Sequence, residues 1–312
     1  MATKYTGHTG SAARRAARRV LPSADGPGRV MSAVDRLERA TELDGASAKL
    51  RTWVKKAPLG RARDALHGRW LGHPVHPLMV QLPIGAWLSA AALDVLPGQR
   101  RGAGALVALG LAGAGPAAVA GWADWAELRP PQQRVGLVHA ACNIGAVALY
   151  AGSLGARGAG RHGLGRLLGF AGLTVVGAGG ALGGHLAYRQ AVGANHAEGL
   201  AARVPSGWQP VGELADFPPG EVVRRTVGEV PVMVVREDRE GTQTVRALVE
   251  QCSHLGGPLA QGEIADGCVR CPWHGSTFRL SDGWNVQGPA TAPQPAFEAR
   301  IVEGRVHLRL RD

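Results

Sequence analysis

Four side chains near the carboxyl-terminal end of the chain have the types and the spacing of a metal centre. They are Cys252 and His254, two residues apart, and Cys271 and His274, three residues apart. Such short spacing lets one loop deliver both ligands of a pair, and residues 255–270 leave room for strands that bring two loops face to face. Two thiolates and two imidazoles can bind a [2Fe–2S] cluster, with each pair supplying one ligand to each iron. They can also bind one zinc ion, but zinc sites usually pair C-x2–4-C with H-x3–5-H, so the spacing favours the cluster.

The segments around these residues, CSHLGGPL at 252–259 and CPWHGSTF at 271–278, resemble the Rieske iron–sulfur family. The resemblance covers about residues 204–312 and implies that the two cysteines bind one iron and the two histidines the other. Glycines in both segments permit positive φ and a close approach of backbone to sulfur. The residues expected to surround the cluster are Gly256, Gly257, Trp273, Gly275, Ser276, Phe278 and Pro289.

The resemblance also predicts the redox potential of the cluster. High-potential members of the family carry a disulfide between two additional cysteines, where this chain has Gly257 (or its neighbour) and Trp273. They also carry a tyrosine where this chain has Phe278, whereas Ser276 keeps a hydroxyl that can donate to a bridging sulfide. We expect a potential in the lower part of the family's range of about −150 to +300 mV. The missing disulfide fits a reducing compartment.

Four apolar runs precede this domain, at about residues 77–96, 103–121, 136–154 and 167–187. Each has the length of about 20 residues that a helix needs to cross the hydrocarbon of a bilayer. Buried helices of a soluble bundle would show polar faces, whereas these runs are nearly free of charge. Glycines four residues apart, such as Gly179 and Gly183, let helices pack closely in lipid. The sequence therefore predicts four transmembrane spans.

The distribution of basic residues predicts the side of the membrane that both ends of this domain face. Lys and Arg are concentrated in the first 72 residues, and the whole chain has a net charge of +11. Because cytoplasmic loops are enriched in these residues, the amino-terminal region is predicted to be cytoplasmic. Four crossings return the chain to the same side. We therefore expect a multi-pass protein of the inner (cytoplasmic) membrane with its cysteine–histidine domain in the cytoplasm.

Four histidines lie at span ends and, by the same topology, at one membrane face: His73, His76, His139 and His185. Ionisable residues at span ends can simply reach the interface or cap a helix. They can also bind a cofactor, such as a haem b held by two histidines, or handle protons beside a quinone. Two motifs, HPVHP at 73–77 and GHLAYRQAVG at 184–193, make residues 70–196 resemble a bacterial membrane family of unknown function. That resemblance implies a four-helix membrane domain and no established activity.

Composition divides the chain into four segments. Residues 1–69 are a basic region, in which 11–22 and 46–70 can form amphipathic helices on anionic lipid; we expect no nucleic-acid binding, although charge alone allows it. Residues 70–193 are the membrane domain, 194–207 a flexible linker, and 208–312 a domain of short alternating strands. The predicted fold is an all-α transmembrane four-helix bundle followed by an all-β antiparallel domain of Rieske type. The residues expected on one face of the amphipathic helix are Leu50, Trp53, Val54 and Leu66.

These features predict a membrane-anchored carrier of single electrons between a soluble donor and a membrane or soluble acceptor. An oxygenase catalytic subunit needs a further iron bound by two histidines and a carboxylate, and the residues after His274 are needed to finish the β domain. A quinol-oxidising subunit with a haem or quinone site remains an alternative, as does a redox sensor or assembly protein. The expected cofactor is a [2Fe–2S] cluster, and the expected partners are the bilayer and redox proteins.

Overall fold

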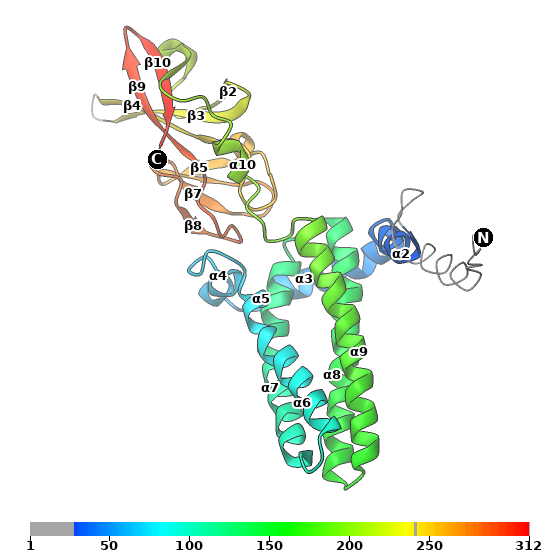
Figure 1. The fold of residues 1–312 in the computed structure, drawn as a ribbon. Helices are drawn as coiled ribbons and strands as arrows, with labels where there is room; N and C mark the ends of the chain where they lie inside the picture. The colour runs from blue at the N-terminus through cyan, green and yellow to red at the C-terminus, as the bar shows by residue number, and fades with distance from the viewer. Residues whose placement is uncertain (1–27, 240–241, 312) are drawn as a thin grey trace, which may run out of the picture.

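The computed structural model describes residues 28–239 and 242–311, and the long helices precede all the strands along the chain (Figure 1). Helices α2 (Gly28–Glu38), α3 (Asp44–Lys56) and α4 (Arg61–His67) lie at one end of a bundle of longer helices. The same end of the bundle carries the β domain. This arrangement confirms the predicted fold class.

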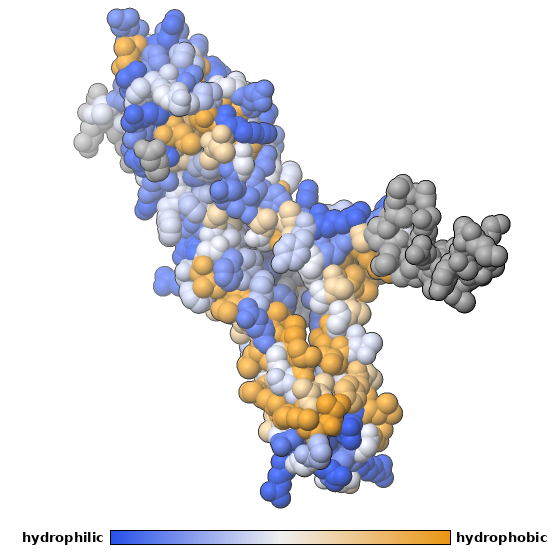
Figure 2. All heavy atoms as spheres, in the orientation of Figure 1, coloured by the Kyte–Doolittle hydropathy of each residue, from blue (hydrophilic) through white to orange (hydrophobic). Residues whose placement is uncertain are grey.

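The bundle begins with a short helix, α5 (Val75–Met79), that leads directly into α6 (Gln81–Val95). Helices α7 (Arg100–Trp125), α8 (Pro130–Gly158) and α9 (His162–Gly184) follow, and a π-helical turn (His185–Arg189) extends the last one. The four resulting segments, Val75–Val95, Arg100–Trp125, Pro130–Gly158 and His162–Arg189, are long and apolar enough to cross a membrane. Figure 2 shows an apolar belt over these helices, with hydrophilic residues at both of its ends. The predicted spans lie within these helices.

The bundle consists of two helix hairpins, α6–α7 and α8–α9. Glycines on α9 let it approach α8 closely, because a Cβ on Gly172 would lie 2.9 Å from the ring of Tyr150. Trp87 of α6 stacks on the same ring, with centroids 4.1 Å apart. At the end of the bundle away from the β domain, Arg157 of α8 donates to Asp94 of α6. Ring stacking and this buried ion pair therefore join the two hairpins.

The β domain contains two antiparallel sheets. The larger has the strand order β1-β10-β9-β4-β3-β2 and the smaller the order β5-β6-β7-β8. Met233 and Leu248 of the larger sheet and Phe278 of the smaller share one buried core, so the smaller sheet packs on one face of the larger. The strands are β1 (Gln209–Glu213), β2 (Val222–Val227), β3 (Val230–Arg239), β4 (Thr242–Val249), β5 (Glu263–Ala265), β6 (Cys268–Arg270), β7 (Thr277–Arg279), β8 (Asn285–Gln287), β9 (Ala296–Val302) and β10 (Arg305–Leu310).

The predicted amphipathic helix over 46–70 is not continuous in the structure. Helix α3 ends at Lys56, α4 begins at Arg61, and Gly60 between them has a φ of +49°. Leu50 and Val54 pack against a buried apolar cluster of the protein, while Trp53 is 77% exposed. The apolar side of α3 is therefore largely covered by protein and not by lipid. The stretch 11–22 lies outside the described residues.

Residues 194–207 were predicted to be a flexible linker, and the structure shows a packed segment instead. It contains the helical turn α10 (Glu198–Ala201), and Leu200 and Val204 pack against the core of the larger sheet. The His196 amide donates to the carbonyl of Ser253 at 2.9 Å. Its small and polar residues suggested flexibility, but two partly buried apolar side chains attach it to the sheet. The segment thus ties the last span to the loop that contains Cys252.

Candidate metal centre

Cys252 and Cys271 begin two loops that close in the same way. In each loop the cysteine amide donates to the carbonyl five residues later, at 2.8 Å in both cases. The amide four residues after each cysteine donates back to its carbonyl, from Gly256 at 2.9 Å and from Gly275 at 3.0 Å. These glycines have φ values of +76° and +74°, a conformation that other residues rarely adopt. The two motifs therefore form loops with the same backbone conformation and the same hydrogen-bond pattern.

The loops bring all four candidate ligands together. The thiols of Cys252 and Cys271 are buried and share a hydrogen bond. The rings of His254 and His274 lie with centroids 5.0 Å apart and planes at 87°. The histidine stands two residues after the cysteine in the first loop and three residues after it in the second. Nevertheless, two sulfurs face each other and two imidazoles face each other.

Electrostatics favours the protonation state that a metal ligand needs at three of the four side chains, whereas the hydrogen bond with Cys271 and burial raise the pKa of the fourth, Cys252. The hydrogen bond from Cys252, helped by the amides of Trp273 and His274 and opposed by burial, lowers the pKa of Cys271 to about 7. Burial lowers the pKa of His274 to about 4. Burial also lowers the pKa of His254 well below its usual value, and the charges of His274 and His67 add to this. Both imidazoles are thus neutral at pH 7, the form that binds metals.

The geometry fits a [2Fe–2S] cluster. The Nδ1 atom of His254 is buried and has no hydrogen-bond partner among the described residues. A buried polar atom left in this state costs about 1–3 kcal/mol, a cost that a bond to a metal would remove. Gly257 is in close contact with the second loop, because a Cβ there would lie 2.8 Å from the Cys271 sulfur. Two thiolates and two imidazoles on facing loops are the donor set of a mixed-ligand cluster.

Ser276 and Phe278, two of the residues predicted to surround the cluster, are buried next to the second loop. The Ser276 hydroxyl is buried and accepts the amide of Ala290 at 3.1 Å, which leaves its proton available for another acceptor. Phe278 is fully buried in the core beneath the second loop. A Cβ on Gly288, just before Pro289, would lie 2.8 Å from the Gly275 carbonyl. The loop that contains Gly288 and Pro289, called the proline loop below, therefore packs directly against the second cluster loop.

Sequence reasoning missed the residue that holds the first loop in place. Gln294 is buried, and its Oε1 accepts the amide of Ser253 at 3.0 Å. Its Nε2 donates to the carbonyls of Val249 and Gln251, at 2.6 and 2.7 Å. One amide side chain thus connects the end of β4 to the loop. No pattern in the sequence distinguishes this glutamine from a surface residue.

The first loop also contacts the membrane domain. Leu255, directly after the candidate ligand His254, is buried with Trp125 and Leu128 at the end of α7. His67 of α4 is buried beneath the same region and donates to Asp124 at 2.9 Å. The sequence did not predict that the two domains touch.

Two polar contacts join the amino-terminal helices to the proline loop. Arg69 donates to the carbonyl of Asn285 at 3.2 Å and to that of Val286. The Asp64 carboxylate accepts the amide of Gly288 at 3.1 Å. The cluster loops thus sit between the membrane domain on one side and a clamped proline loop on the other.

Of the four histidines predicted at the membrane face, the structure brings two together. The rings of His76 and His139 lie 6.2 Å apart. His185 instead pairs with Glu38 of α2, at 2.7 Å. His73 is exposed, and its Nδ1 bonds to the carbonyl of Pro74.

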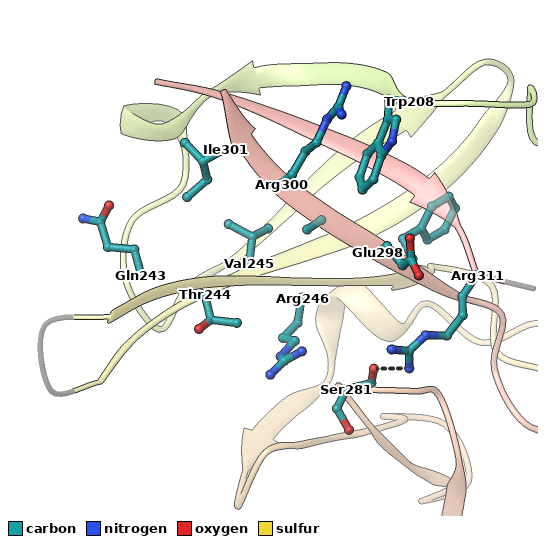
Figure 3. Close-up of a pocket in the computed structure, with 12 residues that line it drawn as sticks. Trp208, Gln243, Thr244, Val245, Arg246, Ser281, Glu298, Arg300, Ile301 and Arg311 are labelled. Atoms are coloured by element: carbon teal, nitrogen blue, oxygen red, sulfur yellow. Dashed lines mark hydrogen bonds between the residues drawn. The ribbon is translucent and has the colours of Figure 1, made fainter. Parts of the chain in front are cut away.

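Cys142 and Cys268 lie apart from the candidate ligands. Cys142 is in α8, and Cys268 opens β6 opposite Arg279, half-buried as a strand residue. The four cysteines are free thiols in the structure. A separate pocket of about 390 Å³ lies on the larger sheet, and none of the candidate ligands lines it (Figure 3). Arg246, Arg300 and Arg311 make that pocket basic.

Comparisons with known proteins agree with both domains. Residues 207–298 match the family described as Rieske [2Fe-2S] domain, and residues 72–196 match the family described as Predicted membrane protein (DUF2231). The anthranilate 1,2-dioxygenase ferredoxin subunit of Burkholderia cepacia is 32% identical over 103 residues, which are 33% of this chain and 92% of that protein. Ferredoxin CarAc of Metapseudomonas resinovorans is 31% identical over 102 residues, with coverages of 32% and 92%.

Among solved structures, the ferredoxin of carbazole 1,9a-dioxygenase from Nocardioides aromaticivorans IC177 covers 34% of this chain and 100% of that chain. It is 24% identical, with a TM-score of 0.31. The sequence relatives span the β domain almost end to end, and the membrane domain matches a separate family. The chain therefore belongs to the Rieske [2Fe–2S] family, and it carries its Rieske domain behind a predicted membrane-protein domain.

Proposed function

We propose that this protein is a membrane-anchored Rieske electron carrier. Cys252 and Cys271 bind one iron of the cluster, and His254 and His274 bind the other. The similarity to ferredoxin subunits supports a role in electron transfer, and four apolar helices support membrane anchoring. A [2Fe–2S] cluster held by these four residues would supply one-electron transfer, between a form with two ferric irons and a form with one ferrous iron.

The contact between the first cluster loop and the membrane domain carries the proposal for the electron route. Leu255 is buried against the end of α7, so the histidine edge of the cluster faces the membrane domain. The Lys55–Glu127 ion pair (2.8 Å) lies close enough to act on the pKa of His274. The redox partner on this side is therefore the membrane domain itself, or a group bound within it.

A soluble partner has a second approach to the cluster. Trp273 is 47% exposed, and its ring lies 6.3 Å from that of His274. An exposed aromatic side chain next to a ligand suits a transient protein contact. We propose this surface as the entry for electrons from a soluble donor.

Helices α2, α3 and α4 of the basic amino-terminal region lie at the same end of the bundle as the Rieske domain. Because positive residues favour the cytoplasmic side, we propose that this end faces the cytoplasm, in the inner membrane. Protease protection in oriented membrane vesicles tests this placement. Cleavage of the Rieske domain only from the opposite side would overturn it.

Purified full-length protein in detergent tests the electron-carrier function. We expect a rhombic EPR signal of a mixed-ligand [2Fe–2S] cluster after reduction, and reversible one-electron titration in the lower part of the range of about −150 to +300 mV. The Cys271→Ser variant is the matched control and should lack the signal. A bound zinc ion in place of iron, or a cluster that cannot be cycled, would contradict the proposal.

A further inference from the structure

Two histidines inside the membrane domain face each other across the two helix hairpins. His76 lies on α5, ahead of the first hairpin, and His139 lies on α8 in the second. Their ring centroids are 6.2 Å apart and their planes are at 84°. Facing helices of a bundle are a usual place for cofactor ligands. Neither residue takes part in the cluster described above.

The hydrogen bonds of both rings define the same tautomer. His76 Nδ1 donates to the carbonyl of Ala117 at 2.8 Å, and His139 Nδ1 donates to that of Gly179 at 2.7 Å. A carbonyl can only accept, so each Nδ1 carries the proton and each Nε2 keeps a lone pair. Metal-binding histidines are usually oriented in this way, by a hydrogen bond from the other ring nitrogen.

The two imidazoles are also held in position by glycines on the neighbouring helices. A Cβ on Gly121 of α7 would lie 2.8 Å from His76 Nδ1, and a Cβ on Gly183 of α9 would lie 3.2 Å from the His139 ring. Any larger residue would displace the rings. Asn143 donates to His139 Nε2 at 3.1 Å and to the His139 carbonyl at 2.9 Å. A ligand on Nε2 would replace the first of these contacts and leave the second.

The number of ligands indicates the kind of metal group. Within the described ranges, no group of three or more His, Cys, Asp or Glu side chains could hold a metal ion. A bare ion needs more than two protein ligands, whereas a porphyrin brings four nitrogens and leaves two axial positions. If both Nε2 atoms point to a shared metal about 2 Å from each, the ring centres lie about 6 Å apart, and the observed spacing is 6.2 Å.

We propose that His76 and His139 are the axial ligands of a b-type haem between the two hairpins of the membrane domain. The haem would accept one electron from the reduced Rieske cluster, so that ferric haem becomes ferrous as the cluster returns to its diferric form. No proton or bond needs to move in this step. The transfer rests on the proposed electron route, whereas haem binding does not.

Absorption spectroscopy of the full-length protein tests this site. The protein is produced with added haem precursor, purified in detergent and, in a second arm, titrated with haemin. We expect a Soret band and the sharp reduced-minus-oxidised bands of a six-coordinate b-type haem, with one haem per chain by the pyridine haemochrome assay. His76→Ala and His139→Ala should each lose this six-coordinate spectrum, while His73→Ala, on an exposed histidine next to the same span, should keep it.

The Rieske EPR signal is recorded for each variant as an independent measure of folding. Loss of haem with an intact cluster signal supports the site. The proposal would be overturned if the wild-type protein bound no haem after haemin titration. It would also be overturned if both histidine variants kept the wild-type haem spectrum. Absence of the cluster signal in the wild-type protein would instead contradict the proposed function and leave the haem result readable.

Discussion

The cluster loops and the membrane histidine pair bring two imidazoles close together by different means. In the Rieske domain, each loop carries its own cysteine and histidine within four residues, and backbone hydrogen bonds inside the loop set their positions. His76 and His139 come from different hairpins, and each is oriented by a carbonyl of a neighbouring helix. A local motif therefore suffices for the first site, whereas the second exists only when the bundle is assembled.

Removing one cysteine ligand should have the largest effect, because it should abolish the cluster without touching the histidine pair of the membrane domain. We expect Cys252→Ser to abolish the Rieske EPR signal, since the replacement hydroxyl does not bind iron as a thiolate does. Cys268→Ser should keep the signal, because Cys268 lies in β6 outside the ligand set. EPR and iron analysis measure both. A cluster retained in Cys252→Ser would show that Cys252 is not a ligand.

The close contact between the two loops should be the next most sensitive point. A Cβ in Gly257→Ala would lie 2.8 Å from the Cys271 sulfur, so the loops must separate and cluster content should fall several-fold. The matched control is Gly199→Ala in α10, where nothing lies within 4 Å of the added Cβ. Iron and sulfide analysis per chain compares them. Equal cluster content would show that the loops tolerate separation.

The same substitution in the bundle tests the assembled site. A Cβ in Gly121→Ala would lie 2.8 Å from His76 Nδ1, whereas one at Gly115, on the same helix, meets nothing within 4 Å. In a helix, Ala is favoured over Gly by about 1 kcal/mol, so Gly115→Ala should be neutral or stabilising. We expect only Gly121→Ala to weaken haem binding, with the Rieske EPR signal unchanged. Haem titration followed by absorbance checks this, and similar affinities would argue against His76 as a ligand.

The contact between the domains should respond more weakly. Arg69→Ala removes hydrogen bonds to the carbonyls of Asn285 and Val286, and a typical hydrogen bond contributes about 0.5–1.5 kcal/mol. We expect faster proteolysis near the docking region while the cluster stays intact. Arg61→Ala, on an exposed arginine of the same helical region, is the control. Identical cleavage rates would mean that the apolar contact of Leu255 suffices.

A surface ion pair beside the second loop should have the smallest effect. The Arg279 guanidinium holds the pKa of Asp282 below its usual value of 3.8, and the Trp284 amide helps. A lowered pKa in the folded state adds stability above pH 3.8 and loses it as pH falls through the folded value. We expect Asp282→Asn to lower the thermal midpoint slightly at pH 7 and not at all at pH 2. Thermal melts followed by tryptophan fluorescence compare the two pH values.

Much of the fold could be predicted from the sequence because its signals are local. The four spans follow from apolar length, and strands such as β2 and β3 follow from alternating valines. The hairpin between β9 and β10 contains Glu303 and Gly304, both at positive φ. The four strands of the smaller sheet have three residues each, too few to show a period.

Other features depended on contacts that no local pattern reveals. The segment 194–207 looked flexible because it is small and polar, but Leu200 and Val204 attach it to the larger sheet. Helix α3 looked like a lipid-binding helix, but Leu50 and Val54 face protein. Amphipathicity predicts that one face is covered and does not predict what covers it.

The sequence by itself predicted the donor set, Cys252, His254, Cys271 and His274, because candidate ligands two and three residues apart need only one loop each. It also determined the four spans, because crossing hydrocarbon requires a set apolar length. Only the tertiary structure decided that the cluster loop contacts α7 and that His76 pairs with His139 while His185 pairs with Glu38. The residues in each of these contacts are far apart in the sequence, so no local pattern predicts them. They follow from how the helices pack, which depends on side chains distributed over the whole bundle.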